Sequence, residues 1–207
     1  MKLLLAMLLP FIVAFADSLE QIRSKGVVRI GVYDGQPPFS ELNDGTFEGF
    51  EVTMAQAIAN DLFGEKGGRI ELVPMKVEDR IPALVNNRVD IVIATITITP
   101  ERAQQIDFST PYFSVNLGVL TRKADRIKSL ADLKEKRILL ESGGTSEAFF
   151  KQEGFGNFTF CKIARECYRM LKDGDVDAYA TDNLIAMAYP VVDSEVEVPL
   201  KTLGKPD

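Results

Sequence analysis

Hydrophobic residues along the chain fall into short runs with two different spacings. Runs of four to seven mostly apolar, often β-branched residues are typical of strands buried in a parallel sheet. Apolar residues three or four positions apart are typical of helices with one buried face. The first kind predicts strands at 27–33, 70–75, 90–95, 117–120, 137–141, 158–163 and 176–180. The second kind predicts helices at 50–63, 80–85, 130–134, 145–153, 165–172 and 183–189.

These elements alternate along the chain in two series. Strands that alternate with helices indicate parallel sheets with right-handed crossovers, so the predicted fold class is α/β. Residues 107–126 separate the series with an aromatic segment and a charged run, and we expect this stretch to pass from one lobe to a second. Ligands of such sheets bind beyond the carboxyl ends of the strands. The loops after these strands should therefore meet in a cleft, and they are 34–40, 95–102, 142–146 and 181–183.

The first sixteen residues have the pattern of a secretory signal peptide. Lys2 gives a positive start, residues 3–16 are apolar, and Ala14 and Ala16 stand where a signal peptidase cleaves before Asp17. A buried N-terminal helix or a retained anchor is the alternative. No cysteine lies near the cleavage site, so we expect an exported, periplasmic protein without a lipid anchor.

Composition excludes several kinds of chemistry. The 207 residues are 46% hydrophobic and 26% charged, as in soluble globular proteins. There is no histidine, which excludes Ser-His-Asp and Cys-His nucleophiles, and two cysteines cannot form a four-cysteine zinc site. With 24 basic against 30 acidic residues, the net charge of −6 argues against nucleic acid as a partner. We expect neither a metal nor a cofactor.

The two cysteines, Cys161 and Cys167, lie six residues apart across a predicted strand end and the following helix. Export would permit a disulfide between them. A bridge and a pair of buried thiols are equally compatible with the sequence.

Two of the cleft loops carry groups that suit a small anion. Thr95 and Thr97 alternate with apolar residues after a strand, and Arg102 follows at a predicted helix start. An arginine fork pairs well with a carboxylate, although a plain helix start capped by Thr99 has the same pattern. The second loop, 142–146, has two glycines before Thr145 and opens a helix, where backbone N–H groups favour negative charge. A simple strand–helix turn is the alternative there.

Three further residues complete a possible ligand site. Asp182 ends a predicted strand and can bind an ammonium group or cap the next helix. Arg80 begins a helix, and Phe39 follows two prolines and is either a core residue or a wall of the cleft. A carboxylate held by an arginine and an ammonium held by an aspartate are together the head group of an α-amino acid.

The sequence also resembles a known family, the extracellular solute-binding proteins of amino-acid ABC transporters (family 3, polar and acidic amino-acid branch). The resemblance covers nearly all of the chain after residue 16. It is carried by eight motifs, which are RIGV at 29–32, PPF at 37–39, GFEV at 49–52, VDIVIA at 89–94, TITPER at 97–102, DFSTPY at 107–112, SLADLK at 129–134 and GDVDAY at 174–179.

The resemblance implies a type II periplasmic-binding-protein fold whose two α/β lobes close on the ligand. Lobe 1 would span 17–113, and lobe 2 would span 114–207 together with the start of a return crossover. Members of the family return to lobe 1 with a further strand and helices, so the chain looks truncated at its C-terminus. We then expect lobe 1 to expose apolar surface at Ile30 and Val92.

The resemblance also assigns roles within the cleft. Arg102 matches the arginine that pairs the ligand α-carboxylate, and Thr97 and Thr145 match positions that add hydrogen bonds to it. Asp182 matches the acid that holds the α-ammonium, with help from the carbonyl of Ala94.

The ligand side chain would meet a different set of residues. Thr95 lines the same strand end, and Phe39 lines the cleft. Arg80 resembles the arginine that glutamate- and aspartate-binding members aim at the ligand side chain. Tyr33 and Ala164 depart from such members, which can carry a lysine and a tyrosine at or near these positions.

The predicted function is therefore binding of a free amino acid, with glutamate or aspartate favoured, and its delivery to the membrane permease of an ABC importer. The protein is expected to be monomeric and not an enzyme. One alternative is an enzyme similar to cyclohexadienyl (prephenate) dehydratases on the same fold, for which Glu141 is the candidate general acid. A ligand-sensing domain is the other.

Overall fold

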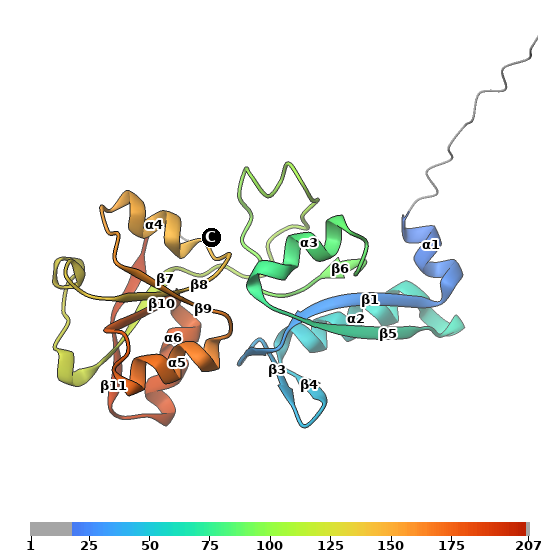
Figure 1. Cartoon of the computed structure of the whole chain (residues 1–207). Coiled ribbons are helices and arrows are strands. Elements are labelled where there is room, and N and C mark those ends of the chain that lie inside the picture. The colour runs from blue at the N-terminus through green and yellow to red at the C-terminus, as the bar shows by residue number, and fades with distance from the viewer. Residues whose placement is uncertain (1–17, 206–207) are drawn as a thin grey trace, which may run out of the picture.

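The computed structural model describes residues 18–205, which form two lobes lying side by side (Figure 1). Each lobe is a sheet flanked by helices, and the chain passes from the first to the second just before residue 117. This confirms the predicted two-lobed α/β fold. The predicted signal peptide, residues 1–16, lies outside the described residues.

Lobe 1 is built around a parallel sheet with the strand order β5-β1-β6. In the central strand β1, alternate residues Val28, Ile30 and Val32 are fully buried and pack with Ala55 and Ala59 of α2. The elements of this lobe are α1 (Ser18–Lys25), β1 (Val27–Tyr33), β2 (Gly35–Gln36), β3 (Ser40–Asn43), β4 (Thr46–Glu48), α2 (Phe50–Phe63), β5 (Arg69–Met75), α3 (Arg80–Val85) and β6 (Ile91–Val92), with 3-10 turns at Gly64–Lys66 and Val77–Asp79.

Lobe 2 contains a mixed sheet with the order β11-β7-β10-β8-β9. Leu139 and Tyr179 face α5 and α6, while Ile138, Leu140 and Phe150 pack on the opposite face beside α4. The elements of this lobe are β7 (Leu117–Arg122), β8 (Ile138–Glu141), α4 (Ser146–Gln152), β9 (Phe158–Cys161), α5 (Ala164–Asp173), β10 (Ala178–Asp182), α6 (Asn183–Val192) and β11 (Val196–Leu203), with 3-10 turns at Lys123–Asp125 and Leu130–Leu133.

The structure corrects the predicted elements in several places, and the helix predicted at 130–134 is a 3-10 turn at Leu130–Leu133. The prediction of wholly parallel sheets is wrong for lobe 2, because β7 runs antiparallel to both β10 and β11. The predicted strand 90–95 is reduced to Ile91–Val92, since Thr95 adopts a left-handed conformation with φ of 46°. The hydrophobic pattern also missed α1, the small β2-β3-β4 sheet and β11, which are short or rich in polar residues.

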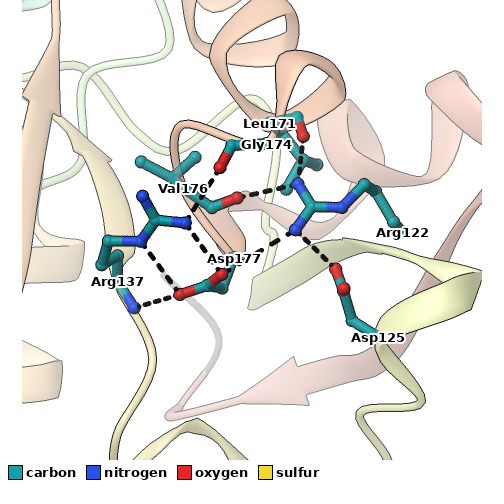
Figure 2. A network of polar contacts seen from close by, with 7 residues as sticks. All are labelled: Arg122, Asp125, Arg137, Leu171, Gly174, Val176 and Asp177. Atoms are coloured by element: carbon teal, nitrogen blue, oxygen red, sulfur yellow. Dashed lines mark hydrogen bonds and ion pairs between the residues drawn. The ribbon is translucent and has the colours of Figure 1, made fainter.

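A network of two arginines and two aspartates ties lobe 2 together ahead of β10 (Figure 2). The Arg137 guanidinium donates to both carboxylate oxygens of Asp177, at 3.2 and 3.1 Å, and to the carbonyl of Gly174 at 2.9 Å. Arg122 lies 3.8 Å from the same carboxylate and forms an ion pair with Asp125 at 2.8 Å. The GDVDAY motif thus has a structural role in this lobe.

Lobe 1 repeats this arrangement with different residues. The Arg29 guanidinium donates to both oxygens of Asp90, at 3.1 and 2.7 Å, and to the carbonyl of Asn87 at 2.7 Å. In each lobe the aspartate directly precedes a strand, Asp90 before β6 and Asp177 before β10. The bonded carbonyl lies three residues before the aspartate and belongs to a residue with positive φ, Asn87 or Gly174. The two lobes therefore share the same local arrangement of an arginine, an aspartate and a backbone carbonyl.

The apolar surface predicted for lobe 1 is present in part. Ile30 is fully buried, so that expectation is wrong. Val92 lies on the edge strand β6 and is half-buried, and it lines a large groove of about 840 Å³ together with Ile91 and residues of the 96–115 segment.

Cys161 and Cys167 form a disulfide, so the alternative of two buried thiols is wrong. It joins the end of β9 to α5 and encloses the short turn that leads to Ala164. Within residues 18–205, no helix is long and apolar enough to cross a membrane.

Candidate functional site

Six of the nine predicted ligand-binding residues line one small cavity between the lobes. Its volume is about 40 Å³, which is far smaller than the groove beside β6. The lining residues are Gln36, Val77, Arg80, Thr95, Thr97, Arg102 and Leu117, followed by Glu141, Gly144, Thr145, Ser146, Ala180, Thr181 and Asp182. Tyr33, Phe39 and Ala94 do not line it.

Arg102 spans the mouth of this cavity from lobe 1 to lobe 2. One nitrogen of its guanidinium donates to the Thr97 carbonyl at 2.8 Å, and another donates to the Gly143 carbonyl at 2.9 Å. Gly143 has φ of 81°, and a side chain there would come within 3.0 Å of the Glu78 backbone in lobe 1. The glycine therefore permits the close approach of the two lobes at this point.

On the lobe 2 side, Thr145 and Asp182 stand at the starts of α4 and α6. Neither side chain makes a capping hydrogen bond to its helix, so the alternative of a plain helix cap is not realised for Asp182. Both residues line the same cavity as Arg102 and Thr97, so lobe 1 contributes a guanidinium and lobe 2 a carboxylate to it.

Thr95 is fixed by a buried carboxylate that the sequence reasoning missed. Glu51, at the start of α2, accepts hydrogen bonds from the Thr95 backbone N–H at 2.6 Å and from the Tyr112 hydroxyl at 2.5 Å. Burial raises the pKa of Glu51. The Thr95 hydroxyl donates to the Gln36 side chain at 2.7 Å. The GFEV motif contained this glutamate, but its partners lie 44 and 61 residues away.

Arg80 lines the cavity but bonds mainly with the backbone of lobe 1. Its guanidinium donates to the carbonyls of Val77 at 3.0 Å, Ala94 at 2.6 Å and Thr95 at 2.9 Å. Burial, together with the nearby Arg102 charge, lowers the pKa of Arg80 to about 10. The carbonyl that was expected to hold the ligand ammonium, that of Ala94, is engaged by this arginine.

Glu141 is the second buried carboxylate of the site, and it connects the lobes. It accepts hydrogen bonds from the hydroxyls of Tyr33 at 2.6 Å, Tyr179 at 2.5 Å and Thr181 at 3.4 Å. Tyr33 comes from β1 and the others from β10. Burial and the Glu141 charge raise the pKa of Tyr33. Tyr33 therefore contacts a wall of the cavity without lining it.

Phe39 lies on the other side of the β6 region. It is 4% exposed, packs edge-on against Phe113 with ring centroids 5.4 Å apart, and lines the large groove. Among residues 18–205, no group of three or more acidic or cysteine side chains is placed to hold a metal ion.

Comparison with known proteins matches the chain to one family. The profile of the bacterial extracellular solute-binding proteins, family 3, matches residues 28–184. The glutamine-binding protein of Geobacillus stearothermophilus is 32% identical over 196 residues, which are 93% of this chain and 74% of that protein.

Two solved structures are also similar. The cysteine-binding protein of Campylobacter jejuni has a TM-score of 0.86 at 36% identity, over 92% of this chain and 77% of that one. The ancestral amino acid-binding protein AncCDT-1, described as a precursor of cyclohexadienyl dehydratase, has a TM-score of 0.81 at 31% identity, over 91% and 82%. The proteins named here share the fold and differ in the ligand that each is named for.

Proposed function

The chain belongs to the bacterial extracellular solute-binding proteins of family 3, and from this we propose that it captures a free amino acid between its lobes and delivers it to the membrane permease of an ABC importer. The relatives named for glutamine and cysteine support an amino acid as the ligand. The N-terminal pattern of residues 1–16 supports export to the periplasm.

One observation carries this proposal: the two lobes contribute opposite charges to a single cavity. Arg102 and Thr97 come from lobe 1, and Asp182 and Thr145 come from lobe 2. A ligand with a carboxylate and an ammonium on one carbon would join both walls at once, so its binding favours lobe closure. Closure of the lobes around the ligand would strengthen a guanidinium–carboxylate contact there, because less solvent would then screen it.

The preference for glutamate or aspartate is a finer hypothesis that rests on Arg80. The hydrogen bonds of this guanidinium to three backbone carbonyls leave less of it for a ligand side chain. Glu141 in the same cavity would repel an acidic side chain. These contacts favour an uncharged ligand side chain over an acidic one.

A second candidate function is catalysis of a dehydration like that of cyclohexadienyl dehydratase. It is favoured by the likeness to AncCDT-1 and by the buried Glu141 in the cleft. Release of phenylpyruvate from prephenate would support this activity. Its absence, together with tight binding of an amino acid, would support transport alone.

The direct test is a thermal-shift screen of the twenty amino acids and prephenate. A ligand at about 100 times its dissociation constant should stabilise the protein by about 2.7 kcal/mol. We expect a raised unfolding midpoint with at least one amino acid. A cooperatively unfolding protein that no amino acid stabilises would contradict the proposed function.

A further inference from the structure

The charges around the cavity balance. Among the described residues, the ionisable side chains that line it are Arg80, Arg102, Glu141 and Asp182, so two positive groups face two negative groups. An amino acid with an uncharged side chain is a zwitterion and preserves this balance. A charged side chain would add an uncompensated charge to an enclosed site, which is costly.

Only part of this set is available to a ligand side chain. In the proposed function, Arg102 and Asp182 hold the ligand head group. Arg80 already donates to three backbone carbonyls. Of the four charged residues that line the cavity, Glu141 is thus the one whose side chain has no role in either the head group or the backbone of lobe 1, because its carboxylate accepts only side-chain hydroxyls among the described residues.

The hydrogen bonds of Glu141 limit what it can accept. Its Oε1 accepts the hydroxyls of Tyr179 and Thr181, whereas its Oε2 accepts, among residues 18–205, only the hydroxyl of Tyr33. A carboxylate oxygen has two lone pairs, so Oε2 retains capacity for one further donor. A ligand hydroxyl, thiol or amide N–H can use it, but a ligand carboxylate offers no donor and brings a second negative charge.

We propose that Glu141 determines the side-chain specificity of the cleft: it favours amino acids whose uncharged side chain carries a hydrogen-bond donor, and it rejects glutamate and aspartate. This inference rests on the proposed function, because it assumes that an amino acid occupies the cavity. It assigns the selection to a residue of lobe 2, whereas the resemblance to the family pointed to Arg80 in lobe 1.

The test compares Glu141→Gln with the wild type and with a matched control, Glu153→Gln. Glu153 is exposed at the end of α4 and undergoes the same change of charge outside the cavity. Calorimetric titration and displacement would give dissociation constants for serine, cysteine, asparagine and glutamine and for aspartate and glutamate. The quantity of interest is the ratio between the better acidic and the best uncharged ligand.

In the wild type and in Glu153→Gln, we expect the acidic ligand to bind about 100-fold more weakly than the best uncharged one. In Glu141→Gln this ratio should shrink by about tenfold or more, because the variant leaves an excess positive charge in the cavity. If Glu141→Gln does not fold, Glu141→Ala tests the same ratio, since it removes the charge without placing a new polar group between the tyrosines.

A wild type that binds glutamate or aspartate best, or a ratio that changes by less than about threefold in the Glu141 variants, would overturn this inference and leave the proposed function intact. A folded wild type that binds no amino acid would instead refute the proposed function, and the inference with it.

Discussion

At the scale of single residues, the site depends on buried side chains that hold its backbone in place. Thr95 has φ of 46°, a conformation that a β-branched residue rarely adopts, and the Glu51 carboxylate holds its N–H there. Arg80 binds the carbonyls of Thr95 and Ala94 from the other side. These two buried side chains shape the strand end that contributes Thr95 and Thr97 to the cavity.

Replacing Glu51 should therefore weaken both stability and binding. Glu51→Ala leaves the Thr95 N–H and the Tyr112 hydroxyl without their acceptor, and we expect a loss of about 2–3 kcal/mol in the free energy of unfolding. Glu51→Gln keeps one acceptor oxygen and should lose less. Urea unfolding of both variants is the measurement, and an alanine variant as stable as the wild type would contradict this role.

At the scale of elements, each lobe is fastened by an arginine–aspartate pair before a strand. Hydrogen bonds from arginine outweigh the effect of burial, which alone would raise the pKa, so the pKa of Asp90 and that of Asp177 are both lowered. An aspartate with a lowered folded-state pKa contributes stability above its unfolded pKa of about 3.9, and this contribution is lost as the pH falls through the folded value.

We expect Asp90→Asn and Asp177→Asn each to lower the free energy of unfolding at neutral pH by about 1–2 kcal/mol, allowing for partial solvent exposure. Below pH of about 4 the difference from the wild type should shrink, because these aspartates become protonated there in the unfolded wild-type chain and, at still lower pH, in the folded protein. Chemical denaturation between pH 3 and pH 7 measures this. A constant difference over that range would show that these carboxylates are not the titrating groups.

The disulfide also stabilises the connection between two neighbouring elements, the end of β9 and α5. Closing a loop as short as the one between Cys161 and Cys167 stabilises a protein by about 2 kcal/mol in the chain-entropy description. The double variant Cys161→Ser, Cys167→Ser should lose about this amount in urea unfolding. Reductant should destabilise the wild type and leave the double variant unchanged. Two thiols that alkylate readily in the oxidised native protein would contradict the bridge.

At the scale of the whole molecule, the lobes are in contact at the mouth of the cavity, with Arg102 bonded to the Gly143 carbonyl. Gly143→Ala should hold the lobes apart, because the new side chain would meet the Glu78 backbone. We expect ligand affinity to fall by about tenfold and small-angle scattering to show incomplete contraction with ligand. Gly154→Ala is the matched control, since Gly154 has a similar φ of 84° and open space around it. An equal loss of affinity in both variants would mean that backbone strain, and not contact with Glu78, causes the loss.

The sequence was sufficient to predict the two-lobed fold and to name four residues that the structure brings to one cavity. Arg102, Thr97, Thr145 and Asp182 follow predicted strands in loops, and parallel strands bring such loops together. The contacts of Glu51 and Glu141 were not predictable, because their partners lie 38 to 108 residues away. The sequence correctly placed Arg80 in the cleft, but it could not predict the hydrogen bonds of its guanidinium to backbone carbonyls. The antiparallel β7 was missed because apolar periodicity does not encode strand direction.

In the proposed function, Arg102 holds the α-carboxylate of an amino acid. Calorimetric titration would compare the best amino acid with its α-carboxamide analogue on the wild type and on Arg102→Ala. On the wild type, we expect the carboxamide to bind at least about 30-fold more weakly, since truncating one partner of an enclosed charge pair costs about 2–5 kcal/mol. On Arg102→Ala, both ligands should bind weakly and within about threefold of each other. A wild-type preference for the carboxylate that survives in Arg102→Ala would contradict the account.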